Sequence, residues 1–120
     1  MARILIVDDE KDLALLLEEI LTLAGHQVIG KAYDGVEAVR IYQELQKNSI
    51  VVLMDYRMPL KNGIEASKEI LAEDPDCKII FISADVSIKE EALDLGIAAF
   101  FEKPALVDDL AAFIQTITAY

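Results

Sequence analysis

Short apolar runs alternate with amphipathic segments about five times along this chain of 120 residues, and this alternation limits the fold more than any other feature. The pattern is typical of an α/β domain in which helices connect parallel strands. Such helical crossovers are right-handed in nearly all cases. A chain of this length forms one domain. The sequence therefore predicts a doubly wound, five-stranded parallel sheet with five helices, in a single domain over residues 1–120.

The expected strands are the apolar runs, at residues 3–7, 27–32, 50–54, 78–82 and 98–101. The expected helices lie between them, at residues 12–24, 35–46, about 63–73, 87–95 and 106–118. The run at 50–54 is apolar throughout, which predicts a central strand that is covered on both faces. The run at 27–32 is more polar, which favours a place at the sheet edge.

Helical spacing of apolar residues indicates which side of each helix packs on the sheet. In the first helix, Asp12 is the expected N-cap and Gly25 the expected stop. The inward positions expected in the first, second and last helices are Leu13, Leu16, Leu17, Ile20 and Leu21; Val36, Val39, Ile41 and Leu45; and Leu110, Phe113, Ile114 and Ile117. His26, in the turn after Gly25, is expected to be exposed and without a role, because it has no second His or Cys nearby for a metal site.

Polar residues follow four of the expected strands. Asp8 and Asp9 follow the first, Asp55 the third, Ser83 the fourth and Lys103 the fifth. In open parallel sheets, ligands bind beyond the carboxyl ends of the strands, where the strand order switches direction. The flavodoxin-like order 2-1-3-4-5 places strands one and three side by side. Under that order the three aspartates become neighbours.

Three clustered carboxylates repel one another, and a hard divalent cation such as Mg²⁺ relieves that repulsion through oxygen ligands. An aspartate can also act as a nucleophile toward phosphorus and form an aspartyl-phosphate. Phosphoryl transfer depends mainly on positioning and on neutralising oxygen charge. An amine such as Lys103 and a hydroxyl such as Ser83 are suited to that task. The residues at the strand ends thus point to a metal and phosphoryl site.

The order of these motifs resembles that of a response-regulator receiver domain of two-component signalling, of the single-domain chemotaxis-regulator kind. The motifs are the acidic pair Asp8 and Asp9, the group Asp55, Met58, Pro59 and Gly63, the pair Ser83 and Ala84, and the pair Lys103 and Pro104. The resemblance covers essentially the whole chain. Each motif is weak alone, but together and in this order they are highly specific.

The resemblance implies a role for each matching residue. Asp55 is the expected phosphoacceptor, with Ser83 binding the phosphoryl group and Lys103 pairing with its oxygens. Mg²⁺ is the expected cofactor, held by Asp9, Asp55 and the main-chain carbonyl of Arg57, with Asp8 acting directly or through water. On this reading the chain is not an enzyme but a phosphoacceptor that assists its own phosphorylation and slow autodephosphorylation.

The switch implied by the resemblance uses Ser83 and Phe100, which falls at the family's switch-aromatic position. Their movement would change the face formed by the fourth helix, fifth strand and fifth helix. Arg57 and Asp85 occupy positions that tune the lifetime of the phosphorylated state, and we expect them to pair across the mouth of the site and hinder the attacking water. The Lys103–Pro104 bond is often cis in this family.

The chain departs from the commonest family pattern at three positions. Ser83 keeps the hydroxyl of the more frequent Thr but lacks its methyl group. Phe100 lacks the hydroxyl that a Tyr would offer a partner. Ala105 stands where a bulky Phe is frequent.

The chain carries 22 acidic and 11 basic residues, for a net charge of −11. This argues against direct binding to nucleic acids, which requires basic residues, and against anionic membranes. No apolar stretch approaches the length of a membrane span and no signal peptide is evident. A single cysteine, Cys77, is compatible with a reducing cytoplasm. The expected partners are a sensor histidine kinase or phosphotransfer protein that donates from phosphohistidine, and an output protein or domain that the sequence does not name. The expected oligomeric state is a monomer or a phosphorylation-dependent dimer.

Three other functions remain to be weighed. An aspartate-nucleophile phosphatase would place a second Asp two residues after the nucleophile, where this chain has Arg57. A flavin- or nucleotide-binding domain would need a Gly-rich phosphate loop after the first strand, where Asp8, Asp9 and Glu10 would repel phosphate. The third is a receiver-like interaction module that is never phosphorylated, and it is the alternative that the sequence leaves open.

Overall fold

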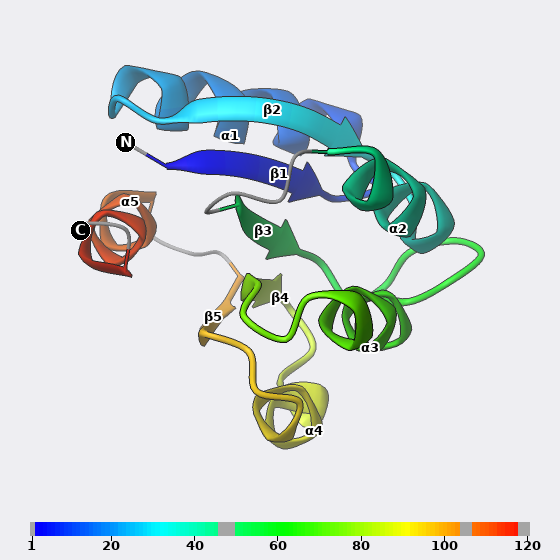
Figure 1. The fold of residues 1–120 in the computed structure, drawn as a ribbon. Helices are drawn as coiled ribbons and strands as arrows, with labels where there is room; N and C mark the ends of the chain where they lie inside the picture. The colour runs from blue at the N-terminus through cyan, green and yellow to red at the C-terminus, as the bar shows by residue number, and fades with distance from the viewer. Residues whose placement is uncertain (1, 46–49, 104–106, 118–120) are drawn as a thin grey trace.

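The computed structural model describes residues 2–45, 50–103 and 107–117, and in these ranges it contains one five-stranded sheet and five helices (Figure 1). The strands are β1 (Arg3–Val7), β2 (Gln27–Ala32), β3 (Ile50–Met54), β4 (Lys78–Ser83) and β5 (Ala99–Glu102). The helices are α1 (Lys11–Leu23), α2 (Gly35–Glu44), α3 (Gly63–Glu73), α4 (Lys89–Asp94) and α5 (Val107–Ile117), and a 3₁₀ turn, η1 (Val86–Ile88), leads into α4.

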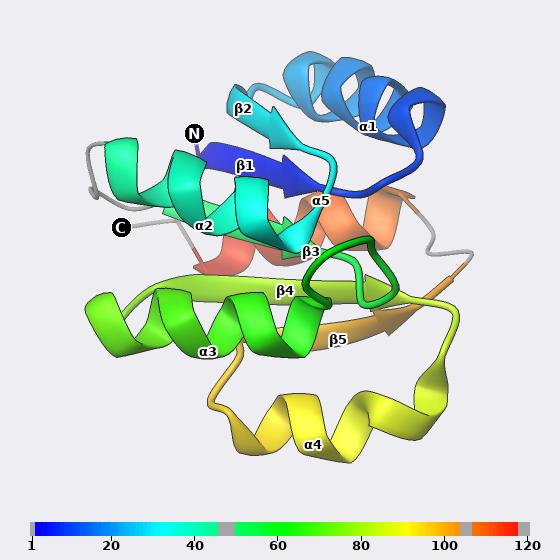
Figure 2. The same cartoon turned by 90° about the vertical axis from the view of Figure 1, so that its right-hand side faces the viewer.

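All paired strands are parallel and their order is β2-β1-β3-β4-β5, so the predicted flavodoxin-like topology is confirmed. The central strand β3 is buried along its whole length and the more polar β2 lies at an edge, as the sequence predicts. The helices α2, α3 and α4 pack on one face of the sheet and α1 and α5 on the other. In Figure 2, α2 and α3 lie in front of the strands and α5 lies behind them.

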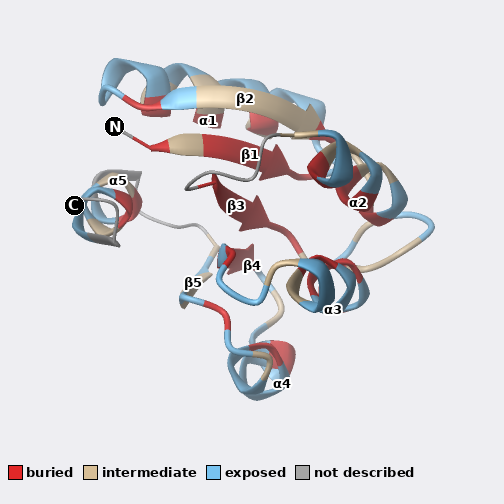
Figure 3. Cartoon of the chain, in the orientation of Figure 1, coloured by how far each residue is buried: buried red, intermediate tan, exposed pale blue. Residues whose placement is uncertain are grey.

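Two apolar clusters hold these layers together, one on each face of the sheet. Strand side chains alternate between them because successive residues of a strand point to opposite faces. In β1, for example, Leu5 and Val7 join the cluster under α2, α3 and α4, whereas Ile4 and Ile6 join the cluster under α1 and α5. Figure 3 shows the buried positions concentrated in the inner strands and on the sheet-facing sides of the helices.

Two of the predicted inward positions face solvent instead. Leu16 of α1 and Val36 of α2 are both about half exposed, at 50% and 47%. In α1 the buried row is Ala14, Leu17 and Leu21, and Leu16 is rotated away from it by the helical period of 3.6 residues. The apolar spacing predicted the correct face of the helix but included too many leucines in it. A small alanine occupies part of the buried face, where the helix and the sheet approach closely.

The predicted N-cap of the first helix is also wrong. α1 begins at Lys11, its cap position is Glu10, and Asp12 lies within the first turn. The side chain of Glu10 makes no capping hydrogen bond. By contrast, Asp34 caps α2 and Asn62 caps α3 through side-chain hydrogen bonds.

His26 is buried, with 5% of its surface exposed, which contradicts the expectation of an exposed loop residue. Gly25 adopts a φ of 93°, and the His26 N–H donates to the carbonyl of Leu21, so the chain turns back toward the sheet. The Nδ1 atom of His26 then accepts a hydrogen bond of 3.0 Å from the Ala2 N–H. His26 therefore joins the start of β1 to the end of α1.

The helix expected over residues 87–95 is divided into η1 and α4, and the strands expected at 78–82 and 98–101 extend one residue further along the chain. Gln46, Leu106 and Thr118, at other expected element ends, lie outside the described residues, as does the side chain of Ile117. Leu110 and Ile114 of α5 are fully buried and Phe113 is partly buried, as predicted. No helix within the described ranges is long and apolar enough to cross a membrane.

Candidate functional site

The pairing of β1 with β3 brings the aspartates together. Val7 is in register with Met54, so Asp8 and Asp55 follow directly from neighbouring strand ends. The Asp55 N–H donates to the Val7 carbonyl at 3.0 Å, which continues the ladder by one residue. One carboxylate oxygen from each of Asp8, Asp9 and Asp55 lies within 4.8 Å of the others. Asp8 and Asp55 are 3% and 8% exposed, whereas Asp9 is exposed.

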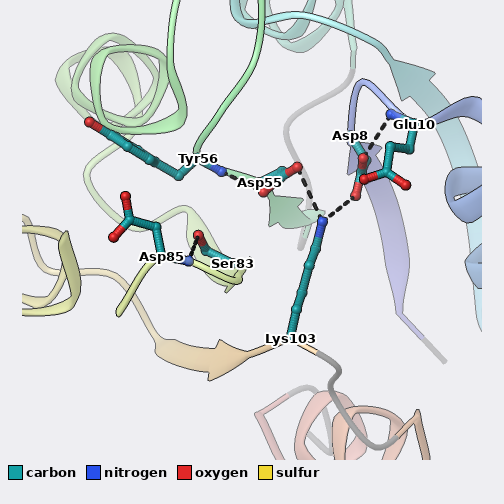
Figure 4. Close-up of polar contacts among 7 residues, drawn as sticks. All are labelled: Asp8, Glu10, Asp55, Tyr56, Ser83, Asp85 and Lys103. Atoms are coloured by element: carbon teal, nitrogen blue, oxygen red, sulfur yellow. Dashed lines mark hydrogen bonds and ion pairs between the residues drawn. The ribbon is translucent and has the colours of Figure 1, made fainter. Parts of the chain in front are cut away.

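Lys103 reaches this cluster from the end of β5, as Figure 4 shows. Its main-chain N–H donates to the Ser83 carbonyl at 2.9 Å, which ties the end of β5 to β4. Its Nζ atom lies 3.2 Å from Asp8 Oδ2 and 3.2 Å from Asp55 Oδ2. One ammonium group therefore bridges two buried carboxylates that are 47 positions apart in the sequence (Asp8 and Asp55).

Burial and charge act in opposite directions at these groups. Burial, followed by the negative charge of Asp8, raises the pKa of Asp55, and the attraction of Lys103 only partly offsets this. Burial also lowers the pKa of Lys103, but the combined attraction of Asp55 and Asp8 outweighs it and the net shift is upward. Lys103 thus stays charged and leaves the site with an excess of negative charge.

This donor set fits a divalent cation. Three carboxylates face a single ammonium group among the described residues, and oxygen is the ligand atom that Mg²⁺ prefers. The exposed Asp9 leaves one side of the cluster open to solvent, as an ion that keeps several waters requires.

Ser83, Arg57 and Asp85 line the same pocket, which has a volume of about 520 Å³ and is also lined by Asp9, Glu10, Asp55, Ala84 and Lys103. Ser83 is buried, and its Oγ atom accepts a 3.0 Å hydrogen bond from the Asp85 N–H (Figure 4). The structure pairs Arg57 with Asp85, with Nη2 2.9 Å from Oδ2. Hydrogen bonds from Ser87, and then the charge of Arg57, lower the pKa of Asp85.

Two glycines lie in close contact with the loop that carries Arg57, and one of these contacts is not evident from the sequence. A Cβ atom on Gly63 would lie 2.1 Å from the Asp55 carbonyl oxygen. A Cβ atom on Gly35, at the start of α2, would lie 2.0 Å from the Lys61 carbonyl oxygen. The second contact joins loop 55–63 to a helix that the sequence analysis did not link to the site. The need for glycine at position 35 arises from this close approach between two segments that are distant in sequence.

Phe100 lies on β5, partly buried against the cluster under α2, α3 and α4, and its ring stacks on Phe81 with centroids 6.2 Å apart. Phe101 packs on the opposite face, where it meets Phe113. The two aromatics therefore point to opposite sides of the sheet, as strand alternation predicts. Pro104 and Ala105 lie outside the described residues.

Comparisons with known proteins agree on one family. The model of the response regulator receiver domain matches residues 4–115. A chemotaxis protein CheY of Thermotoga maritima is 44% identical over 104 residues, which cover 85% of each chain. CheY in a complex with CheX, BeF₃ and magnesium from Borrelia burgdorferi has a TM-score of 0.91 and 30% identity, over 97% of this chain and 88% of that one. The response regulator TrrA of Thermotoga maritima, in complex with Mg²⁺ and beryllium fluoride, has a TM-score of 0.87 and 28% identity, over 98% of this chain and 99% of that one.

This chain belongs to the family of response regulator receiver domains. Its general function is therefore that of a phosphorylation switch in two-component signalling, and such domains are phosphoacceptors. The family resemblance stated from the sequence motifs is confirmed.

Proposed function

We propose that residues 1–120 form one receiver domain in which Asp55 accepts a phosphoryl group from a phosphohistidine. The observation that carries this is the bridge from Lys103 to both Asp55 and Asp8, at 3.2 Å each, inside an open pocket. In the transfer, the P–N bond of phosphohistidine breaks and a P–O bond to Asp55 forms. The donor imidazole leaves with the electron pair and takes up a proton.

Magnesium is the proposed cofactor, held by the carboxylates of Asp8, Asp9 and Asp55 and by the main-chain carbonyl of Arg57. When bound, it supplies positive charge that offsets the charge on phosphoryl oxygens. Lys103 supplies charge from the side of β5, and the Ser83 hydroxyl is placed to donate a hydrogen bond from the end of β4. The buried environment of Asp55 strengthens these interactions because little water competes with them.

The proposed switch begins at Ser83. Its Oγ atom is held by the Asp85 N–H, so a move toward the phosphoryl group would pull on the loop that leads into η1 and α4. Phe100, stacked on Phe81 in the neighbouring strand, is expected to change its packing at the same time. The face formed by α4, β5 and α5 would then differ between the two states. A shift from 1:99 to 99:1 needs roughly 5.5 kcal/mol, a large part of which a few charge-assisted hydrogen bonds can supply.

The pair of Arg57 and Asp85 is proposed to set the lifetime of the phosphorylated state. The two side chains pair at 2.9 Å and both line the pocket, and the Asp85 carboxylate also accepts a 3.0 Å hydrogen bond from the Ser87 N–H. We propose that this bridge crosses the mouth of the pocket and obstructs water that approaches the phosphoryl group, which would make autodephosphorylation slow.

The proposed partners follow from the same chemistry. A sensor histidine kinase or phosphotransfer protein donates the phosphoryl group, and an output protein or domain reads the altered face. The net charge of −11 argues against direct binding of nucleic acid or of anionic membranes by this domain. A cytoplasmic location and a monomer, or a dimer that forms on phosphorylation, complete the proposal.

Acetyl phosphate with Mg²⁺, followed by intact mass spectrometry and peptide mapping, tests this function. We expect one phosphoryl adduct on the wild type, none on Asp55→Asn, and an unchanged adduct on Asp76→Asn, a control acid that is exposed at the opposite end of the sheet. An absent adduct on a wild type shown to bind Mg²⁺ would favour the alternative, a receiver-like interaction module that is not phosphorylated.

A further inference from the structure

The first residue of α1 contacts an aromatic ring from a different loop. Lys11 Nζ lies 5.0 Å from the centroid of the Tyr33 ring. An ammonium group within about 6 Å of an aromatic face is attracted by the ring's quadrupole. Lys11 directly follows the acidic segment Asp8–Glu10, and Tyr33 directly follows β2. The contact therefore joins the acidic loop to the neighbouring edge of the sheet.

Hydrogen bonds also restrain the segment Asp8–Glu10, and the Glu10 carbonyl accepts one of 3.0 Å from the Ala14 N–H in α1. Asp8 Oδ1 accepts a 2.9 Å hydrogen bond from the Glu10 N–H, which fixes the turn between them. The side chain of Glu10, at the cap position of α1, makes no capping hydrogen bond. Asp9 is the exposed member of the three clustered aspartates, so burial does not hold its carboxylate in place. Asp9 lies two residues before Lys11, the first residue of α1, so a contact that holds Lys11 also restrains the backbone at Asp9.

Tyr33 is a firm support for such a contact. Its N–H donates to Glu37 Oε1 at 2.8 Å, and the Glu37 N–H in turn donates to Asp34 Oδ1 at 2.7 Å. Tyr33 also packs against the apolar cluster under α1 and α5. The preceding residue, Ala32, accepts a 3.0 Å hydrogen bond from the Asp8 N–H. The two loops are thus joined at both ends of the acidic segment, by the backbone at Asp8 and by the ring at Lys11.

We propose that Tyr33 and Lys11 are positioning residues for magnesium binding. The ring–ammonium contact holds the loop so that the Asp9 carboxylate stays beside those of Asp8 and Asp55. Neither Tyr33 nor Lys11 belongs to the proposed ligand set. This inference rests on the proposed function, because it concerns the same metal site.

Magnesium affinity of Tyr33→Leu and Tyr33→Phe is the test, measured by titration with MgCl₂ at constant ionic strength and followed by amide NMR shifts. We expect Tyr33→Leu to weaken binding by about two- to five-fold, the range of an exposed cation–π contact. Tyr33→Phe keeps the ring and should bind as the wild type does. Neither substitution changes the charge of the folded protein at neutral pH, so a Coulomb effect on the metal is excluded.

The Lys11→Gln background makes the test specific. Removal of the positive charge of Lys11 raises magnesium affinity by itself. We therefore compare the change in magnesium affinity that Tyr33→Leu causes in the wild type with the change that it causes in the Lys11→Gln background. We expect Tyr33→Leu to have no further effect when Lys11 is absent. Equal magnesium affinity of Tyr33→Leu and the wild type would overturn the inference. So would a Tyr33→Phe variant that loses as much magnesium affinity as Tyr33→Leu, or a Tyr33→Leu effect on magnesium affinity that is as large in the Lys11→Gln background as in the wild type. A wild type that binds no Mg²⁺ would overturn the proposed function itself.

Discussion

The negative charge of Asp55 is expected to lower the stability of the metal-free protein. The carboxylate oxygens of Asp55 and Asp8 lie within 4.8 Å of each other. With an effective dielectric constant near 20, two unit negative charges at that distance repel by roughly 3.5 kcal/mol or more. On the same scale, the charges of Lys103 and Asp55 at 3.2 Å attract by about 5 kcal/mol. The attraction exceeds the repulsion from Asp8 by only about 1.5 kcal/mol on this scale, and Asp9, within the same 4.8 Å, adds further repulsion. The burial of Asp55, which costs several kcal/mol for an ion, therefore decides the sign.

Asp55→Asn should therefore stabilise the protein in EDTA at neutral pH, by about 1–3 kcal/mol. With the slopes usual for a domain of this size, the midpoint of urea denaturation should rise by about 1 M. Because a bound divalent cation neutralises the same charge, excess MgCl₂ should stabilise the wild type more than Asp55→Asn. The difference in stability between the two proteins should therefore become smaller. Asp76→Asn, at an exposed position, serves as the control and should change little. This reasoning would be refuted if Asp55→Asn were less stable than the wild type in EDTA, or if Mg²⁺ left the difference in stability between the two proteins unchanged.

Three other predictions concern contacts around and away from the site. Arg57→Ala breaks the 2.9 Å bridge to Asp85, so the phosphoryl adduct should decay roughly two- to five-fold faster in a time course by intact mass, and an unchanged decay would exclude the proposed lifetime control. Gly35→Ala should lower the free energy of unfolding by about 3 kcal/mol because its Cβ would meet the Lys61 carbonyl at 2.0 Å, whereas a small loss in urea denaturation would show that the loop yields. Burial lowers the pKa of His26 in the folded chain, so the unfolded chain binds the proton first and stability should fall as the pH drops below 6.5. Urea midpoints of His26→Gln should lack this part of the pH dependence, and an identical slope in both proteins would contradict the assignment.

The errors of the sequence analysis have a common origin in packing that a linear pattern does not contain. Leu16 and Val36 fit an apolar helical period, yet the face that meets the sheet uses Ala14 and Ala38 instead. His26 looks like a turn residue until the positive φ of Gly25 directs it against the start of β1. Each case was decided by where a neighbouring element lies.

The order and type of the residues were enough to predict the class of fold and to select the residues of the candidate site. Apolar runs of strand length separated by amphipathic helices leave a doubly wound parallel sheet as the favoured arrangement, and polar residues at strand ends must then gather at one edge. Asp8, Asp9 and Asp55 could be grouped on that basis alone, because their neighbourhood follows from strand order.

The contacts that hold these residues in place become visible only in the folded chain. The bridge of Lys103 to two carboxylates, the contact of Gly35 with the loop after Asp55, and the ring of Tyr33 against Lys11 all join segments that are distant in sequence. Such contacts depend on distances of a few ångströms between loops. Residue type and spacing do not specify distances of that kind, because they arise from the packing of the whole sheet and its helices.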